Sequence, residues 1–283
     1  MLNLALIRPL IQSALKEDIG RGDITSQAII FPSSCGQAEI VAEEEGILVG
    51  VELAKEVFRL VCSEKVEFSY SLKDRDILVK GEPVLIVKSE ALNILEGERT
   101  ALNFLSRLSG IATLTKKYVD LIHPFKVKIL DTRKTTPNLR LLEKYAVKIG
   151  GGFNHRFALD DGILIKDNHI KACGGVKEAV ARVRRSLSPF KKIEVEAARL
   201  SQVEEALAAK ADIIMLDNMS IEEMKRAVKL IRESNKGTLI EVSGGVNLES
   251  VVEIARTKVD LISVGQLTHS ARSLKMSLNL MES

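Results

Sequence analysis

The sequence predicts an α/β protein, built as an incomplete parallel α/β barrel with a smaller N-terminal α/β sandwich domain. From residue 127 onward, short apolar runs that end in polar residues alternate with amphipathic helical segments. Strands that are apolar on both faces and alternate with helices are typical of a parallel sheet covered by helices. Six such units at a spacing of about 20 to 35 residues favour a barrel, or most of one.

The composition excludes several classes of protein. Hydrophobic residues make up 46% and charged residues 28% of the 283 positions, as in an ordinary globular enzyme. The net charge of +3, the 4% of aromatic residues and the absence of Trp argue against nucleic-acid binding, which needs a dense basic patch and stacking surfaces. No apolar run is long enough to span a membrane, and no basic segment precedes the first apolar stretch.

The three cysteines indicate the compartment. Cys35, Cys62 and Cys173 lie far apart, without zinc-ligand or C-x-x-C spacing. An odd, scattered set of this kind is typical of a reducing compartment. We therefore expect a cytoplasmic protein.

The N-terminal part is expected to form the smaller domain, over residues 1–110. An amphipathic helix is predicted over residues 1–18, followed by a loop rich in Gly and Asp at 16–26. A helix is predicted at 51–61, among strands at 37–44, 46–50, 66–72, 76–79 and 82–88. The hairpin-like GEPVLIV is reminiscent of a lipoyl or biotinyl carrier, but no Lys lies in a tight turn between matching strands. A long helix from about residue 91 to 122 closes this part.

The barrel domain is expected over residues 111–270, followed by a C-terminal segment, 271–283, that could pack back on the N-terminal domain. Its strands are predicted at 127–131, 162–166, 193–196, 212–217, 238–243 and 261–265. Ser201 with Glu204, and Ser220 with Glu223, have the spacing of a capping box, which places helix starts after two of the strands. A doubly wound open sheet is the alternative, but no G-x-G-x-x-G follows the first strand.

Cationic residues gather at the carboxyl ends of the first two predicted strands and just before the second of them. In a parallel barrel these ends form the mouth where active sites lie. The groups concerned are Arg133, Lys134, His155, Arg156 and Lys166. Acidic neighbours could balance part of their repulsion, but a polyanionic ligand is the better interpretation.

Small residues follow the last two predicted strands. SGGV contains Ser243, Gly244 and Gly245, and VGQLTHS contains Gly265. Barrels commonly bind phosphate with the loops after their last two strands, where Gly allows the backbone to approach closely. We favour a phosphate site over plain turns.

Carboxylates end the strands between these two groups. Glu194 and Glu196 lie in one strand, and Asp217 ends the next. Glu196 and Asp217 could hold a divalent ion, for Mg²⁺ partly through water, or accept hydrogen bonds from ribose hydroxyls. They could equally be barrel-lining groups that the nearby cations satisfy.

Several of these segments resemble the quinolinate phosphoribosyltransferase family, also called nicotinate-nucleotide pyrophosphorylase (decarboxylating). The resemblance rests on DTRKTTPNLR, KYAVKIGGGFNHR, ILIKDNHI, EVE, LDN, SGGV and SVGQLTHSA. EDIGRGDITS near the start and GERTALNFLSRLSGIAT in the long helix fit the same family, so the likeness covers nearly the whole chain.

The resemblance implies an N-terminal α/β sandwich, an incomplete barrel, and a homodimer, sometimes assembled further, in which each partner completes the other's site. It implies that quinolinate and 5-phosphoribosyl-1-pyrophosphate, with Mg²⁺, give nicotinate mononucleotide, pyrophosphate and CO₂ in NAD biosynthesis.

The resemblance also implies roles for single residues. Those expected to bind quinolinate are Arg99 (from the partner subunit), Arg133, His155, Arg156 and Lys166. Those expected to bind the phosphoribosyl donor are Lys134, Glu196, Asp217, Ser243, Gly244, Gly245, Gly265 and His269. Those expected to act in catalysis are Lys134, Lys166, Glu196 and Asp217, with Glu196 and Asp217 also contacting the metal through water.

Three positions depart from the family pattern. Asn138 stands where Gly is usual, Val242 replaces a small residue, and Lys275 lies where an acidic residue is common.

Three other functions stay open. The first alternative is a related phosphoribosyltransferase for another aromatic acid. The second is a barrel aldolase that uses Lys166 as a Schiff-base amine. The third is a binding protein that has kept the fold but lost turnover.

Overall fold

The computed structural model describes residues 2–31, 34–63, 65–186, 188 and 190–281. They form two compact units. Unit 1 comprises residues 1–114, 137–150 and 271–283, and unit 2 comprises residues 115–136 and 151–270. None of the described helices is both long and apolar enough to cross a lipid bilayer.

Unit 1 is built on a four-stranded antiparallel sheet in the order β12-β1-β5-β3. The strands are β1 (Cys35–Ala42), β3 (Glu67–Ser71), β5 (Pro83–Glu90) and β12 (Met276–Leu280). A two-stranded sheet pairs β2 (Gly46–Ile47) with β4 (Ile77–Leu78). Because β12 pairs with β1, the end of the chain belongs to this unit.

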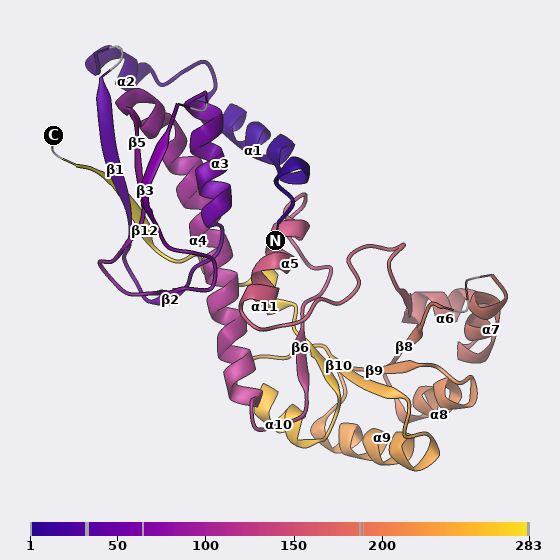
Figure 1. Ribbon diagram of the computed structural model, residues 1–283. Coiled ribbons are helices and arrows are strands. Elements are labelled where there is room, and N and C mark those ends of the chain that lie inside the picture. The colour runs from indigo at the N-terminus through magenta and orange to yellow at the C-terminus, as the bar shows by residue number, and fades with distance from the viewer. Residues whose placement is uncertain (1, 32–33, 64, 187, 189, 282–283) are drawn as a thin grey trace. The chain divides into compact units, whose positions relative to one another are not determined.

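Helices α1 (Leu4–Ile19), α3 (Val51–Val61) and α4 (Ala91–Ile122) accompany this sheet, with α4 continuing from unit 1 into unit 2 at Thr115 (Figure 1). Buried apolar residues recur at helical spacing along α3 and give it one packed face. The loop expected at residues 16–26 is wrong at both ends, because α1 continues to Ile19 and a short helix, α2, begins at Ile24. Asp23 caps α2 (Ile24–Ile29) by accepting hydrogen bonds from the backbone N–H groups of Thr25 and Ser26.

The segment 137–150, which lies inside the range expected for the barrel domain, packs in unit 1. It contains α5 (Arg140–Ile149). Two contacts hold the helix there. The Arg107 guanidinium lies 2.8 Å from the fully buried carboxylate of Glu143, and the Tyr145 hydroxyl donates to Asp74 at 2.7 Å. These partners are distant in sequence, so local patterns could not predict them.

Asn138, the second residue of this segment, lies in the left-handed backbone region, with φ at 64°. Glycine adopts this conformation without strain, and Asn tolerates it better than most residues. The departure from the family's usual Gly is therefore one that the backbone accommodates.

Unit 2 is a parallel sheet of six strands in the order β6-β11-β10-β9-β8-β7, and the predicted fold class is confirmed. The strands are β6 (Lys128–Leu130), β7 (Ile163–Ile165), β8 (Ile193–Ala197), β9 (Ile213–Asp217), β10 (Leu239–Ser243) and β11 (Leu261–Ser263). β6 and β7 form the two edges of the sheet, so the barrel stays incomplete. Each predicted strand of the barrel overlaps one of these six.

Helices follow the strands of this sheet (Figure 1). They are α6 (Asp167–Cys173), α7 (Val176–Ser186), α8 (Leu200–Ala208), α9 (Ile221–Ser234), α10 (Val251–Arg256) and α11 (Gln266–His269). The predicted capping box at Ser220 and Glu223 is present at the start of α9. The one predicted at Ser201 is wrong, because α8 begins at Leu200 and Arg199 is its N-cap.

Candidate active site

A cavity of about 700 Å³ opens at the carboxyl ends of the strands of unit 2. Every strand of the sheet contributes to its wall, directly or through the loop that follows. The cavity brings together all of the predicted site residues except Arg99: Arg133, Lys134, His155, Arg156, Lys166, Glu196, Asp217, Ser243, Gly244, Gly245, Gly265 and His269. Seven separate stretches of the sequence therefore share one site.

The loop after β6 carries Arg133 and Lys134. The Thr132 side-chain oxygen accepts the backbone N–H of Lys134 at 3.0 Å, and the Thr268 hydroxyl donates to the Lys134 carbonyl at 2.8 Å. These hydrogen bonds fix the loop, which lies outside the hydrogen-bonded strands of the sheet. Lys134 is exposed and Arg133 half-buried, so both side chains can reach a ligand in the cavity.

Arg156 lies on the same wall. Its Nη1 donates to the Gly162 carbonyl at 3.0 Å. Burial lowers the pKa of Arg156, and the charge of the neighbouring Arg133 lowers it further. Two guanidinium groups that repel each other across a cavity form a site prepared for an anion, because a bound carboxylate relieves that repulsion.

Lys166 follows β7 and extends toward Glu196 of β8. The Lys166 Nζ lies 2.8 Å from Glu196 Oε2. Glu196 is largely buried, whereas nearly half of the Lys166 side chain is exposed. The ion pair places a cation and a carboxylate side by side at the mouth, where they can contact different parts of a ligand.

Asp217 ends β9, and the next residue holds its carboxylate. Asn218 Nδ2 donates to Asp217 Oδ2 at 2.8 Å, and the Asn218 backbone N–H donates to the Ser243 carbonyl at 3.0 Å. Asn218 has φ at 53°, in the left-handed region. Asn218 belongs to the sequence motif LDN, but the sequence alone assigns it no role, because its contacts depend on an unusual backbone conformation.

The glycine-rich loop after β10 passes very close to Asn218. A Cβ at Gly244 would lie 2.3 Å from Asn218 Oδ1, and Gly244 has φ at +92°. Only glycine fits at this position without displacing its neighbours. After β11, a Cβ at Gly265 would lie 3.1 Å from both Lys134 Cδ and His269 Nε2. Gly244 and Gly265 carry no side chain of their own that could cover the backbone of this wall, which suits phosphate binding by backbone N–H groups.

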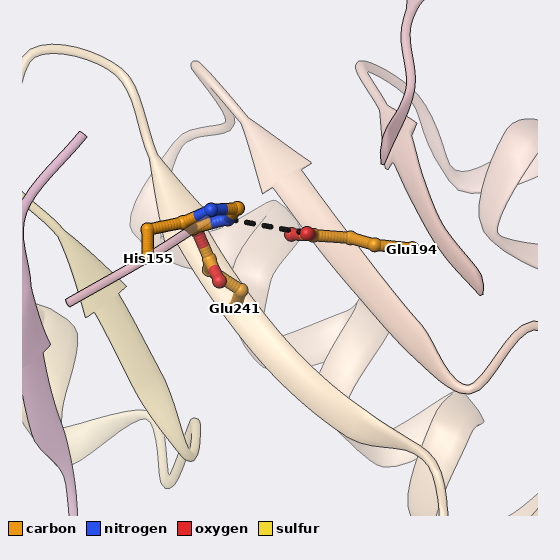
Figure 2. A group of neighbouring side chains, drawn as sticks. All are labelled: His155, Glu194 and Glu241. Carbon is orange, nitrogen blue, oxygen red and sulfur yellow. Dashed lines mark ion pairs between the residues drawn. The ribbon is translucent and has the colours of Figure 1, made fainter. Parts of the chain in front are cut away.

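The His155 ring faces two carboxylates, those of Glu194 and Glu241 (Figure 2). Its Nε2 is 3.1 Å from Glu194 Oε2 and 3.6 Å from Glu241 Oε1. Burial raises the pKa of Glu241 to about 8, and the adjacent Glu194 carboxylate contributes to this rise. Sequence analysis missed Glu241. Period-two alternation could have found it, since residues 241 and 243 share one face of β10.

Arg99 is not among the residues that line this cavity. It belongs to α4 in unit 1 and lines a second cavity of about 800 Å³, formed entirely within that unit. Its guanidinium is largely exposed and lies 3.6 Å from Glu98. Glu17, Asp18 and Lys275 also line this cavity.

The family resemblance implies a bound Mg²⁺, and the carboxylates of the cavity show whether the site suits this ion. Glu196 and Asp217 offer carboxylate oxygens, the type of ligand that Mg²⁺ prefers. Both have one oxygen bonded to a protein partner, which leaves few donors for direct coordination. The residues therefore fit a Mg²⁺ ion held mainly through water and substrate oxygens.

Comparisons with known proteins agree across the whole chain. The sequence models described as "Quinolinate phosphoribosyl transferase, N-terminal domain" and "Quinolinate phosphoribosyl transferase, C-terminal domain" match residues 23–109 and 111–279. The chain is 46% identical over 279 residues to a Bacillus subtilis protein named "Probable nicotinate-nucleotide pyrophosphorylase (carboxylating)", covering 99% of this chain and 95% of that one.

Two further relatives extend the comparison. A tobacco protein, "Quinolinate phosphoribosyltransferase (decarboxylating) 2a, mitochondrial", is 41% identical, over 97% of this chain and 82% of its own. The crystal structure of NadC from Streptococcus pyogenes superposes with a TM-score of 0.92 at 42% identity, over 100% of this chain and 99% of that one.

Proposed function

The chain belongs to the quinolinate phosphoribosyltransferase family, and on this premise we propose that quinolinate and 5-phosphoribosyl-1-pyrophosphate meet in the cavity of unit 2. The enzyme transfers the phosphoribosyl group to quinolinate and releases pyrophosphate and CO₂, giving nicotinate mononucleotide for NAD biosynthesis. The words carboxylating and decarboxylating name the two directions of this one reaction. The observation that carries the proposal is the shared cavity, with cations on one wall and the glycine-rich loops on another.

Quinolinate binds through its two carboxylates. Arg133 and Arg156 offer planar guanidinium groups that match a carboxylate with two parallel hydrogen bonds, and Lys166 adds a third cation at the mouth. This clamp aims the ring nitrogen at C1 of the ribose. Holding the two reactants in this orientation removes much of the entropic barrier to their reaction.

The phosphoribosyl donor occupies the other wall. Ser243, Gly244, Gly245 and Gly265, with His269 nearby, accept its 5′-phosphate, supported by the close approach that the glycines permit. Glu196 and Asp217 accept hydrogen bonds from the ribose hydroxyls. Lys134 contacts the pyrophosphate. Mg²⁺, when bound, supplies further positive charge to the leaving pyrophosphate.

The reaction follows from where charge develops. As the bond from C1 to pyrophosphate breaks, positive charge grows on the ribose and the carboxylates of Glu196 and Asp217 stabilise it. Lys134 stabilises the negative charge on the leaving group. The new bond makes the pyridine nitrogen cationic. The adjacent carboxylate can then leave as CO₂, its electron pair staying on the ring carbon until a proton replaces it.

The complete site is a property of a homodimer in this proposal. Arg99 is exposed, lines a cavity of its own unit, and matches the arginine that the family resemblance assigns to the partner's quinolinate. We also place the protein in the cytoplasm, which the three free cysteines support. The aldolase alternative is weaker, because Lys166 ends in an ion pair rather than in the apolar pocket that favours a neutral amine.

Calorimetric titration of quinolinate tests the clamp. Arg133→Ala and Arg156→Ala should each weaken binding by at least about 100-fold, because each leaves a bound carboxylate without its cation. Arg182→Ala serves as the control, since this surface arginine of unit 2 pairs with Glu178. Unchanged affinity in both cavity variants, with the fold intact by circular dichroism, would refute the clamp.

A further inference from the structure

Two buried carboxylates have no part in the proposed chemistry. Glu194 of β8 and Glu241 of β10 are 5% and 1% exposed, and both face the His155 ring inside the barrel (Figure 2). Burying a carboxylate is costly unless it has a partner, so a pair of them needs a structural or functional reason.

The His155 ring uses both of its nitrogens within the protein. Nδ1 accepts the backbone N–H of Arg156 at 2.7 Å, so the ring proton lies on Nε2. Nε2 in turn faces Glu194 at 3.1 Å and Glu241 at 3.6 Å. Neither nitrogen is directed at a ligand in the cavity. The contribution of His155 to quinolinate binding therefore runs through the residue that it holds.

Arg156 needs such support because of its place in the chain. Residues 154–156 lie outside the described helices and strands, so no ladder fixes their backbone. The backbone N–H of His155 donates to Asp131 Oδ1 at 2.8 Å, and that of Arg156 donates to the imidazole. Side-chain hydrogen bonds thus set the position from which the Arg156 guanidinium reaches the cavity.

Glu194 and Glu241 contact the His155 ring, which in turn holds Arg156. Glu194 Oε1 has no hydrogen-bond partner among the described residues, whereas Oε2 lies 3.1 Å from His155 Nε2; the charge of Glu194 also acts on Glu241 and on Arg156. Glu241 is held in turn by the Ser263 hydroxyl, which donates to Glu241 Oε1. The acids thereby fix the ring from the edge opposite to Arg156.

We propose that Glu194 and Glu241 are positioning residues for quinolinate: they orient the His155 imidazole, which holds the Arg156 backbone at the cavity wall. This inference rests on the proposed function, in which Arg156 binds a carboxylate of quinolinate. A shift of about 1 Å in a group that orients a substrate can lower the rate by as much as 100-fold. Loss of the contacts that hold Arg156 should therefore have a measurable effect on the reaction.

A bound metal is the competing interpretation of the same three side chains. Their ligand atoms all lie within 4.8 Å of one another. The contacts favour positioning, because His155 already pairs with Glu194 and Ser263 already donates to Glu241. Elemental analysis of the purified enzyme separates the two: positioning requires no stoichiometric transition metal. One equivalent in the wild type that is lost in Glu194→Gln would overturn the inference.

Steady-state kinetics of the full-length enzyme gives the main test. In Glu194→Gln the amide keeps the shape but makes a weaker hydrogen bond to His155. The KM for quinolinate should rise about tenfold, and the KM for the phosphoribosyl donor should change by less than about twofold. A role in folding alone would lower the melting temperature and leave both KM values unchanged, which would overturn the inference.

A double-mutant cycle asks whether Glu194 acts through Arg156. Arg156→Lys alone should raise the KM for quinolinate, because lysine cannot form the bidentate contact. In that background Glu194→Gln should add less than about twofold, since the pathway is already broken. A further rise of about tenfold would show that Glu194 acts independently and would contradict the proposal.

The controls separate failure of this inference from failure of the proposed function. No effect of Arg156→Lys on quinolinate would overturn the clamp itself. An effect of Arg156→Lys without one of Glu194→Gln would overturn the positioning role alone. Glu56→Gln is the matched control, since Glu56 is 2% exposed and pairs with Arg8 in unit 1. It should lower stability and leave the KM for quinolinate unchanged.

Discussion

At the scale of single residues, the pH dependence of stability follows from Glu241. Burial and the Glu194 carboxylate raise the pKa of Glu241 from 4.5 to about 8, while His155 and Ser263 act in the opposite direction. The folded state therefore holds a proton that the unfolded state has lost at neutral pH. Its contribution to stability is complete below about pH 4.5 and is lost as the pH rises through about 8.

Denaturant unfolding at a series of pH values checks this sign. The free energy of unfolding of the wild type should fall between about pH 5 and pH 9 relative to that of Glu241→Gln, whose amide carries no titrating proton. Parallel curves for the two proteins would show that Glu241 is ionised in the folded state at neutral pH.

The glycine at position 244 gives a second prediction at this scale. Gly244→Ala forces a methyl group to within 2.3 Å of Asn218 Oδ1 at a backbone φ of +92°. We expect the KM for the phosphoribosyl donor to rise at least about tenfold and the free energy of unfolding to fall by about 1 to 3 kcal/mol.

Gly20→Ala is the control for backbone strain alone. Gly20 has φ at +59° with nothing within 4 Å of the added methyl group. This variant should lose about 1 to 2 kcal/mol of stability with no change in the KM for the donor. A normal KM in Gly244→Ala would argue against the phosphate cradle.

At the scale of elements, helix capping separates what sequence patterns can predict from what they cannot. Ser220 and Glu223 form the predicted box at the start of α9 because every group involved lies within four residues. Ser201 has the same spacing, but α8 begins two residues earlier than a Ser201 cap requires, which leaves Ser201 inside the helix. Element boundaries depend on the tertiary path of the chain, which spacing does not contain.

Stability measurements distinguish the two serines. Ser220→Ala should lower the free energy of unfolding by about 1 kcal/mol, since it removes an N-cap acceptor. Ser201→Ala should change it by less than about 0.5 kcal/mol, as is usual for an exposed substitution. Equal losses in the two variants, measured by chemical denaturation, would mean that α8 also depends on a serine cap.

The strands of the barrel were predictable for a related reason. Each of the six combines a short apolar run with a polar end, and helical segments separate them, so periodicity alone locates them. Their polar ends converge because parallel strands share one edge, which explains why Arg133, Lys166 and Asp217 could be grouped from sequence. Glu241 escaped notice because it lies inside a strand, where the apolar pattern hides it.

At the scale of the whole molecule, sequence could not place segments that pack against distant partners. Residues 137–150 join unit 1 through the contacts of Glu143 and Tyr145, although they lie between two strands of the barrel. The sequence alone also could not place the functional residue Arg99. Its side chain lines the cavity of unit 1 and is not among the residues that line the cavity of unit 2, so the proposed role in quinolinate binding requires a partner subunit.

Subunit mixing tests the shared site of the proposed homodimer. Arg99→Ala and Lys166→Ala should each inactivate the enzyme. If each site takes Arg99 from one chain and Lys166 from the other, a mixed dimer contains one intact site. An equal mixture after exchange of subunits should recover about a quarter of wild-type activity. No recovery, with mixed dimers present by mass spectrometry, would place Arg99 and Lys166 in the same chain's site.

The account depends most on a dicarboxylate being the true substrate of the cationic cavity. The most direct measurement is the release of pyrophosphate and CO₂ by the wild-type enzyme with the phosphoribosyl donor, Mg²⁺ and either quinolinate or nicotinate. Quinolinate should yield the two products in equal amounts, and nicotinate, which lacks the second carboxylate, should yield neither at a comparable rate. Pyrophosphate release with nicotinate at the quinolinate rate, or release with quinolinate but without CO₂, would contradict the account.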